Sequence, residues 1–197
     1  MPAQQRGEET RSRILEAATE AFARYGYDAT GVAEICRRAD VTKGAFYHHF
    51  PSKQAVFLEM LERWLGGIDK GLETARLDGE NAPDRLLAMT AMFRPVFQEA
   101  GGRLPIFLEF LTKAGHSPVV WQATVAPFRK YHAFFSRIIQ DGIDEGSLRS
   151  LDPDRASNVL IAYAVGLLAL GLLDPHGDDW SQVAEDGMSM LLEGVQR

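Results

Sequence analysis

Apolar residues recur at intervals of three and four along most of the chain, which places them on one face of an α-helix. The first such run ends at Tyr25, and Gly26 follows as a helix stop. Its apolar positions are Ile14, Ala17, Ala18, Ala21, Phe22 and Tyr25. From Asp84 to Gly194 the pattern is again helical, without an alternating run that would predict a strand. We therefore predict an all-α fold of about nine helices.

A second helix is expected from about Val32 to Ala39, and a short third helix should begin after Thr42. The Thr42 hydroxyl can accept a hydrogen bond from an amide one turn into that helix. Phe46 and Phe50 are four residues apart and share a face, which would hold this short helix to a scaffold. Asp40 falls in the turn between the two helices, where a positive φ is often needed. A tight turn between two short helices, supported by a preceding helix, predicts a helix-turn-helix unit.

Three runs of sequence carry a resemblance to a known family. They are Gly26-Tyr27-Asp28-Ala29-Thr30, Val32-Ala33-Glu34-Ile35, and the segment from Val41 to Lys53. Over roughly residues 8–60, the chain resembles the N-terminal domain of tetracycline-repressor-like (TetR family) regulators. Gly31 stands where that family commonly has a capping Thr or Ser, and Asp40 where it commonly has Gly. Both departures concern cap and turn geometry, not the outward face of the third helix.

The resemblance implies a set of residues that meet DNA. These are Thr42, Lys43, Gly44, Tyr47, His48 and Lys53. Tyr47 and Lys53 would contact phosphates, while Phe46 and Phe50 match core positions. Gly44 suits a close approach to the groove, because it has no side chain. Without the resemblance, the same face reads equally well as an ordinary polar surface.

The distribution of charge limits where DNA could bind. The 197-residue chain has a formal net charge of −6, but residues 1–52 contain seven basic and seven acidic side chains, so the deficit lies after residue 52. Between residues 37 and 53, four basic side chains accompany only Asp40. This patch is the evident place for phosphate. Arg11 and Arg13 lie near a helix N-terminus, a placement that suits an anionic partner or a solvated surface.

Composition excludes several other classes. Cys36 is the only cysteine, so no internal disulfide can form, and a reducing compartment such as the cytoplasm is expected. Cys36 is interpreted as a packing residue, since it lies on an inward helix face. His48 and His49 diverge on a helix and have no third ligand nearby, so we expect no metal and no cofactor. The longest apolar run, residues 159–173, is too short to predict a membrane span.

The domain boundary is placed before the fourth helix. Ser52 should cap a helix that runs from Lys53 to near Leu77. Glycines at 66, 67 and 71 weaken its second half and indicate either a hinge or a site of close packing. We predict a helix-turn-helix DNA-binding domain over residues 1–52 and a larger helical effector-binding and dimerisation domain over residues 53–197.

The middle of the chain is expected to contain a pocket. Helices over about 84–100 and 118–144 contain Pro95 and Pro127, each of which should kink or break its helix. Large adaptable side chains cluster around these prolines and indicate a cavity for an apolar or aromatic effector. The candidate pocket residues are Trp64, Met89, Phe93, Phe107, Phe110, Trp121 and Phe128. A filled aromatic core is the equal alternative.

The last two helices indicate a dimer. Asp152-Pro153 should start a helix that ends near Leu173, and Asp178 or Asp179 should cap the final one. The first of these is apolar nearly all round, which predicts burial on more than one side. Pairing with a second copy would bury that surface in a four-helix interface. The candidate interface residues are Tyr163, Leu167, Leu168, Met188 and Leu191.

These features predict a homodimeric regulator that binds double-stranded operator DNA and responds to a small-molecule effector. The resemblance implies a repressor released by the effector, which is the commoner mode in that family, with activation as the other mode. A constitutive helix-turn-helix protein without an effector is the first alternative. A helical-bundle enzyme is the second, but the sequence has no phosphate loop, dinucleotide fingerprint, Glu-x-x-His or Gly-x-Ser-x-Gly motif. We therefore expect no enzyme activity.

Overall fold

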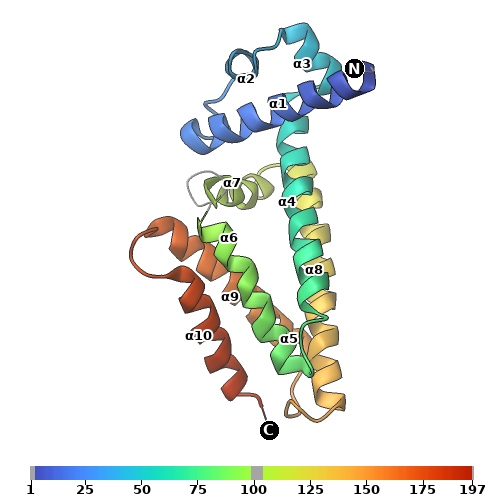
Figure 1. The fold of residues 1–197 in the computed structure, drawn as a ribbon, viewed down its shortest axis with the longest axis vertical. Helices are drawn as coiled ribbons and strands as arrows, with labels where there is room; N and C mark the ends of the chain where they lie inside the picture. Colours follow the sequence, from blue (N-terminus) through green and yellow to red (C-terminus); the bar gives the residue numbers. More distant parts are fainter. Residues whose placement is uncertain (1–2, 99–103, 197) are drawn as a thin grey trace. The chain divides into compact units, whose positions relative to one another are not determined.

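The structure, a computed structural model, describes residues 3–98 and 104–196. The described residues form ten α-helices and one 3-10 helix, and an isolated antiparallel bridge joins Leu148 to Gln196 (Figure 1). The helices are α1 (Ala3–Tyr25), α2 (Val32–Ala39), α3 (Lys43–His49), α4 (Lys53–Ala75), α5 (Ala82–Ala88), η1 (Met89–Met92), α6 (Phe93–Gln98), α7 (Leu104–Ala114), α8 (Pro118–Asp144), α9 (Pro153–Leu173) and α10 (Trp180–Glu193). The all-α prediction is confirmed.

The chain divides into two compact units. The first contains Met1–Trp64 and Gly101–Trp121, and the second contains Leu65–Ala100 and Gln122–Arg197. The division therefore falls inside α4 and inside α8. The first unit includes α7, which the sequence-based boundary had assigned to the effector domain. That functional boundary, after residue 52, stays a prediction.

The turns of the first unit form as the sequence predicts. Gly26 ends α1 with φ +80°, and Asp40 follows α2 with φ +51°, the left-handed conformation expected at the helix-to-helix turn. The Val41 amide closes this turn by donating to the Cys36 carbonyl oxygen at 3.0 Å. Gly31 provides no side-chain cap for α2, as its missing hydroxyl implies. The turn leaves α3 free to begin at Lys43 under its Thr42 cap.

Aromatic side chains form the core of the first unit. Phe22, Phe46, Phe50 and Phe57 are essentially inaccessible to solvent. The Phe57 ring lies 5.9 Å from that of Phe22 and 4.1 Å from that of Phe110 on α7, centroid to centroid. Contacts of this kind add roughly 0.5–1.5 kcal/mol per pair beyond simple area burial. Helix α7 is therefore part of the core that supports the helix-turn-helix.

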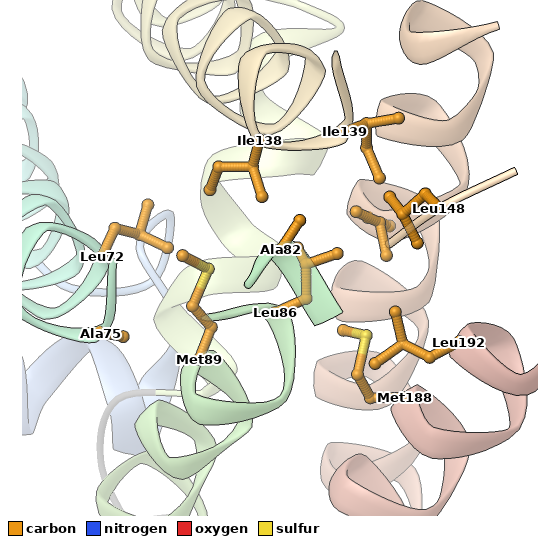
Figure 2. Close-up of a cluster of buried hydrophobic side chains, with 11 residues drawn as sticks. Leu72, Ala75, Ala82, Leu86, Met89, Ile138, Ile139, Leu148, Met188 and Leu192 are labelled. Atoms are coloured by element: carbon orange, nitrogen blue, oxygen red, sulfur yellow. The ribbon is translucent and has the colours of Figure 1, made fainter. Parts of the chain in front are cut away.

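A second apolar cluster forms the core of the other unit (Figure 2). It contains Leu72, Ala75, Ala82, Leu86, Met89, Ile138, Ile139, Leu148, Leu160, Met188 and Leu192. These residues come from the end of α4, from α5, η1, α8, α9 and α10, and from the segment after α8. The Glu145 carboxylate fixes the start of α5 by accepting from the Ala82 amide at 2.6 Å.

The two interior prolines have different effects. The single helix predicted over residues 84–100 is instead α5, η1 and α6, with the 3-10 segment just before Pro95. Pro95 has no amide hydrogen for the carbonyl one turn earlier, which accounts for the irregular turn there. Pro127 lies inside α8, and that helix continues unbroken from Pro118 to Asp144, so the expected break is absent.

Helix α9 is long and apolar enough to cross a membrane by length and composition, although the sequence analysis had judged its apolar run too short. Only 28% of its most apolar window is buried within the chain. Part of α9 belongs to the core of the second unit, through Leu160. Its Tyr163 hydroxyl also bonds to carbonyl oxygens of α10. A large apolar surface on α9 nevertheless remains uncovered in the single chain.

Candidate nucleic-acid interface

The structure brings five of the six predicted DNA-contacting residues onto one exposed face. Thr42, Lys43, Gly44, Tyr47 and His48 are all exposed, from the cap of α3 to its last turn, and the Tyr47 side chain is 53% accessible. Thr42 caps the helix, with its hydroxyl oxygen accepting from the Ala45 amide at 3.1 Å. Phe46 and Phe50 point into the core with 0% and 1% accessibility. The division of α3 into an anchored and an outward face agrees with the sequence prediction.

Arg11 of α1 holds the end of α3 in place. Its guanidinium donates to the His49 carbonyl oxygen at 3.1 Å, pairs with the Glu59 carboxylate of α4, and lies 4.5 Å over the Phe50 ring. Arg11 is therefore not simply solvated, and the anionic group that it reaches within the chain is Glu59. The side chain is occupied by partners on α3 and α4, neither of which is close to it in sequence.

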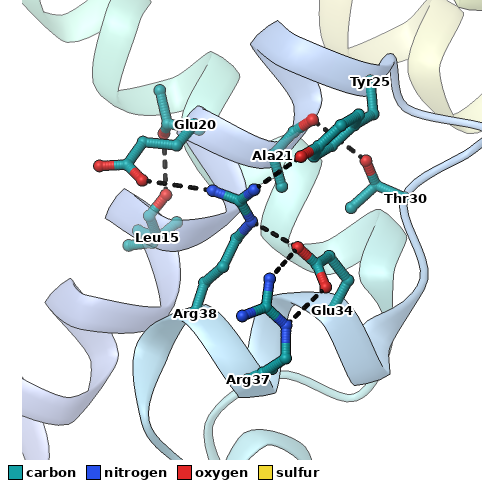
Figure 3. Close-up of polar contacts among 9 residues, drawn as sticks. Leu15, Glu20, Ala21, Tyr25, Thr30, Glu34, Arg37 and Arg38 are labelled. Carbon is teal, nitrogen blue, oxygen red and sulfur yellow. Dashed lines mark hydrogen bonds and ion pairs between the residues drawn. The ribbon is translucent and has the colours of Figure 1, made fainter.

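A charged network connects α2 to α1 (Figure 3). The Glu34 carboxylate accepts from Arg37 at 2.7 and 2.9 Å and from Arg38 at 2.7 Å. Arg38 also pairs with Glu20 at 3.6 Å and donates to the Tyr25 hydroxyl at 3.0 Å. Hydrogen bonds from Arg37 and then Arg38 lower the pKa of Glu34 from its ordinary 4.5 to about 2. Glu34 thus fixes two of the basic side chains that form the positive patch.

Lys53, the sixth predicted DNA contact, is bound to the loop between α1 and α2. Its ammonium donates to the carbonyl oxygens of Tyr27 at 2.6 Å and Thr30 at 2.9 Å, and it sits 4.1 Å over the Tyr27 ring. Burial lowers the pKa of Lys53, with smaller effects from neighbouring charges. The side chain therefore connects the start of α4 to the loop between α1 and α2. Its predicted phosphate contact stays a prediction.

One cavity of about 430 Å³ lies within the first unit, between α1, α4 and α7. It is lined by Leu15, Glu16, Thr19, Glu20, Met60, Arg63, Trp64, Ile106 and Phe110. Its apolar floor includes Trp64 and Phe110, two of the predicted pocket residues, while two carboxylates and one guanidinium lie at its edge. A hollow of about 520 Å³ in the second unit is lined mainly by polar residues of α5, η1, α6 and α10, and by none of the predicted ones.

The remaining predicted pocket residues are dispersed. Met89 belongs to the core cluster of the second unit, and the Phe93 ring stacks on Phe97 with centroids 6.0 Å apart. Trp121 and Phe128 are exposed. The Phe107 side chain lies outside the described residues. The grouping of all seven around one effector stays a prediction.

The predicted dimer-interface residues are largely occupied within the chain. Leu167, Leu168 and Met188 are buried, and the Tyr163 hydroxyl donates to Val183 and Ala184 carbonyl oxygens at 2.9 Å. Leu191 is partly buried and packs against the core of the second unit. The apolar side chains of α9 and α10 that remain exposed are Val159, Leu170, Leu173 and Met190. Helical periodicity located the apolar helices but could not show which of their faces the chain already covers.

Comparison with known proteins decides the family. The model of "Bacterial regulatory proteins, tetR family" matches residues 14–60. The HTH-type transcriptional activator FasR of Mycolicibacterium smegmatis is 31% identical over 84% of this chain and 70% of its own length. The chain belongs to the tetR family of bacterial regulatory proteins.

One further relative and one solved structure are also similar to this chain. The HTH-type transcriptional repressor DhaR of a Mycobacterium species is 28% identical over 80% of each chain. The crystal structure of a putative transcriptional regulator from Saccharomonospora viridis, in complex with choline, has the same fold, with a TM-score of 0.81 and 23% identity over 96% of this chain and 100% of that one. The protein is a DNA-binding transcriptional regulator with an N-terminal helix-turn-helix, and not an enzyme.

Proposed function

We propose that this regulator binds a near-palindromic operator as a homodimer, through the exposed face of α3, and is a repressor released by a small-molecule effector. The observation that carries the proposal is the division of α3 between the buried pair Phe46 and Phe50 and the exposed residues around Tyr47. A short helix fixed on one side and polar on the other suits insertion into a major groove. Cytoplasmic localisation follows from action on DNA.

The chemistry of the exposed face fits the two kinds of contact that DNA requires. The Tyr47 hydroxyl and the Lys43 ammonium can bond to phosphate oxygens, and Lys43 and His48 can also donate to base edges. A Cβ atom at Gly44 would meet only the Thr42 hydroxyl oxygen at 3.7 Å, an ordinary contact. No contact within residues 3–98 and 104–196 therefore requires glycine at that position, whereas close approach to DNA would.

The uncovered surface of α9 and α10 supports the dimer. Leu170, Leu173 and Met190 are 51%, 78% and 73% accessible in the single chain. Large exposed apolar side chains mark interaction sites, and a second copy of the same helices would cover those of α9 and α10 in a two-fold arrangement. A two-fold dimer reads half-sites that lie about 34–36 Å apart, or one helical turn of DNA.

The cavity in the first unit supports an effector. Its floor is formed by Leu15, Met60, Ile106 and Phe110, so an apolar or aromatic body fits. Glu16 and Glu20 at its edge favour a ligand that also has a cationic or hydrogen-bond-donating group. The fold itself can accommodate a small organic molecule, as the choline complex of the S. viridis protein illustrates. An effector changes DNA affinity only if it binds one conformation better than another.

Selection of bound sequences from random double-stranded DNA tests the DNA-binding proposal. The full-length chain should enrich one sequence with two-fold symmetry, whose half-sites lie one helical turn apart. An enriched site without symmetry would contradict the homodimer. Absence of any enriched sequence would contradict operator binding through α3.

A single-tryptophan variant tests the effector cavity. Replacing Trp121 and Trp180 with Phe leaves Trp64, at the cavity, as the only indole. A small-molecule library enriched in aromatic amines should contain compounds that change its fluorescence and also release the selected operator. A matched variant that keeps only Trp180 should give no such change. Compounds that release operator without affecting Trp64 would place the effector elsewhere.

A further inference from the structure

The loop between α1 and α2 is held by a helix that is distant in sequence. The Tyr27 amide donates to both carboxylate oxygens of Glu109 on α7, at 2.8 and 2.7 Å. Lys113, one turn further along α7, pairs with Asp28 at 2.5 Å and lies 5.6 Å from the Tyr27 ring centroid. We call this pair, Glu109 and Lys113, the α7 clamp. A carboxylate that accepts from a backbone amide forms one of the stronger hydrogen bonds in proteins.

The clamp acts at a point that determines where α2 begins. Thr30, the last loop residue before the Gly31 cap, donates through its hydroxyl to the Gly26 carbonyl oxygen at 2.8 Å and approaches that of Ala21 at 3.2 Å. Lys53 of α4 donates to the carbonyl oxygens of Tyr27 and Thr30. The loop is thus bonded to α1 and α4 from one side and to α7 from the other. A shift of α7 acts directly on the loop that leads into α2.

Helix α7 is also a wall of the cavity in the first unit. Ile106 and Phe110 line that cavity, and Glu109 adjoins Phe110 in the chain. The Phe110 ring packs on Phe57, whose ring lies 4.5 Å from that of Tyr27. Bonds of 2.7–2.8 Å are lost after a displacement of about 1 Å. An occupant that moves α7 by this small distance would therefore release the Tyr27 amide.

We propose that Glu109, assisted by Lys113, is a positioning residue for operator binding, and that the α7 clamp transmits occupancy of the cavity to the DNA-binding helices. This inference rests on the proposed function. With the clamp closed, α2 and α3 keep one orientation, and operator binding loses little conformational entropy. With the clamp open, the loop is freer and the same contacts give a weaker complex. The clamp contacts no DNA and acts only through the loop.

The test uses the full-length protein and the operator obtained by selection from random DNA. Fluorescence anisotropy gives the Kd at several salt concentrations, and amide hydrogen exchange reports on residues 26–30. In Glu109→Ala, the amides of that loop should exchange faster, and the operator Kd should rise about tenfold, as expected for the loss of one charge-assisted hydrogen bond shared between two oxygens. The slope of log Kd against log salt should stay at the wild-type value, because no phosphate contact is lost.

Four further variants separate positioning from general stability. Glu109→Gln keeps an oxygen acceptor for the Tyr27 amide and should restore most of the affinity. The double exchange Asp28→Lys with Lys113→Asp re-forms the ion pair in reverse and should bind operator better than Lys113→Asp alone. Ile139→Val, in the core of the second unit, should lower the melting temperature without changing the Kd.

The outcomes distinguish this inference from the function on which it rests. Faster loop exchange in Glu109→Ala with a wild-type Kd would overturn the clamp and leave operator binding intact. Wild-type loop exchange in the same variant would also overturn the clamp. If Glu109→Ala does not fold, Glu109→Gln and the double exchange are compared with wild type instead. The clamp is then overturned if the double exchange binds operator no better than Lys113→Asp alone. Failure of the wild-type chain to select any DNA would overturn the proposed function, and this inference with it.

Discussion

The guanidinium of Arg11 donates to the carbonyl oxygen of His49, the last residue of α3. This bond joins α1 to the C-terminal end of α3, where carbonyl groups have no partner within the helix. A positive charge is also favourable at that end, because the helix dipole is negative there. The position of the candidate recognition helix therefore depends on a residue outside the exposed face that we propose meets DNA.

Arg11→Met should lower both stability and operator affinity. The substitution leaves the Glu59 carboxylate, which is only 17% accessible, without its main partner and removes the bond to His49. Loss of one partner of such a pair typically costs about 1–3 kcal/mol of unfolding free energy, which urea unfolding can measure. Arg11→Lys keeps the positive charge but loses the guanidinium group that bonds to both Glu59 and His49. The stability and operator affinity of Arg11→Lys should therefore lie between those of wild type and Arg11→Met. Wild-type stability in Arg11→Met would contradict the structural role.

Lys43→Ala and Tyr47→Phe should weaken operator binding in different ways. Lys43→Ala removes a phosphate-binding cation, so the slope of log Kd against log salt should decrease in magnitude by about one. Tyr47→Phe removes a neutral hydroxyl and should leave that slope unchanged. Tyr47→Phe should raise the Kd about fivefold, the loss of one ordinary hydrogen bond. Both side chains are exposed, so the melting temperature should stay constant. An unchanged Kd in either variant removes that residue from the interface.

Glu34→Gln should reduce stability in a pH-dependent way. The pKa of Glu34 is lowered from 4.5 to about 2, so its carboxylate stabilises the folded state above pH 4.5, and this contribution disappears as the pH falls through about 2. The difference in unfolding free energy between wild type and Glu34→Gln should therefore be largest near neutral pH and shrink below pH 4.5. A difference that stays constant down to pH 2 would show that the ion pairs with Arg37 and Arg38 are not its source.

Leu170→Glu should convert the proposed dimer into a monomer. Leu170 is 51% accessible on α9, so a charge there does not disturb the core of the single chain but would be buried at the proposed interface. Light scattering during gel filtration measures the change in mass. Leu77→Glu is the matched control, because Leu77 is 74% accessible but lies in the turn after α4. Equal masses for Leu170→Glu and wild type would exclude this face of α9 from the interface.

Local rules predicted much of the first unit. The left-handed turn at Asp40 and the cap at Thr42 each follow from a residue and its immediate neighbours. In the second unit, the final helix is capped by Asp179, one of the two aspartates expected there, whose carboxylate accepts from the Ser181 and Gln182 amides. Features of this kind depend on hydrogen bonds within one turn, and the residue types that make them are few.

Contacts between distant segments could not be predicted in the same way. Arg11 meets Glu59 across 48 residues, and Tyr27 meets Glu109 across 82. The residues next to an arginine or glutamate in the sequence do not show whether the fold brings a distant partner into contact with it. Trp64 and Phe110 line one cavity, while the grouping of all seven candidate pocket residues stays a prediction, since apolar periodicity describes which face of a helix is buried but not which element buries it.

The placement of α7 in the first unit has a consequence for building hybrid regulators. A chimera that transplants only residues 1–64 onto another sensor would carry the loop at Tyr27 but not Glu109, Lys113 or the Phe110 ring that packs on Phe57. Such a chimera would retain the DNA-reading face without its supporting helix. A functional chimera should contain residues 104–121 together with residues 1–64, because both segments belong to the same compact unit.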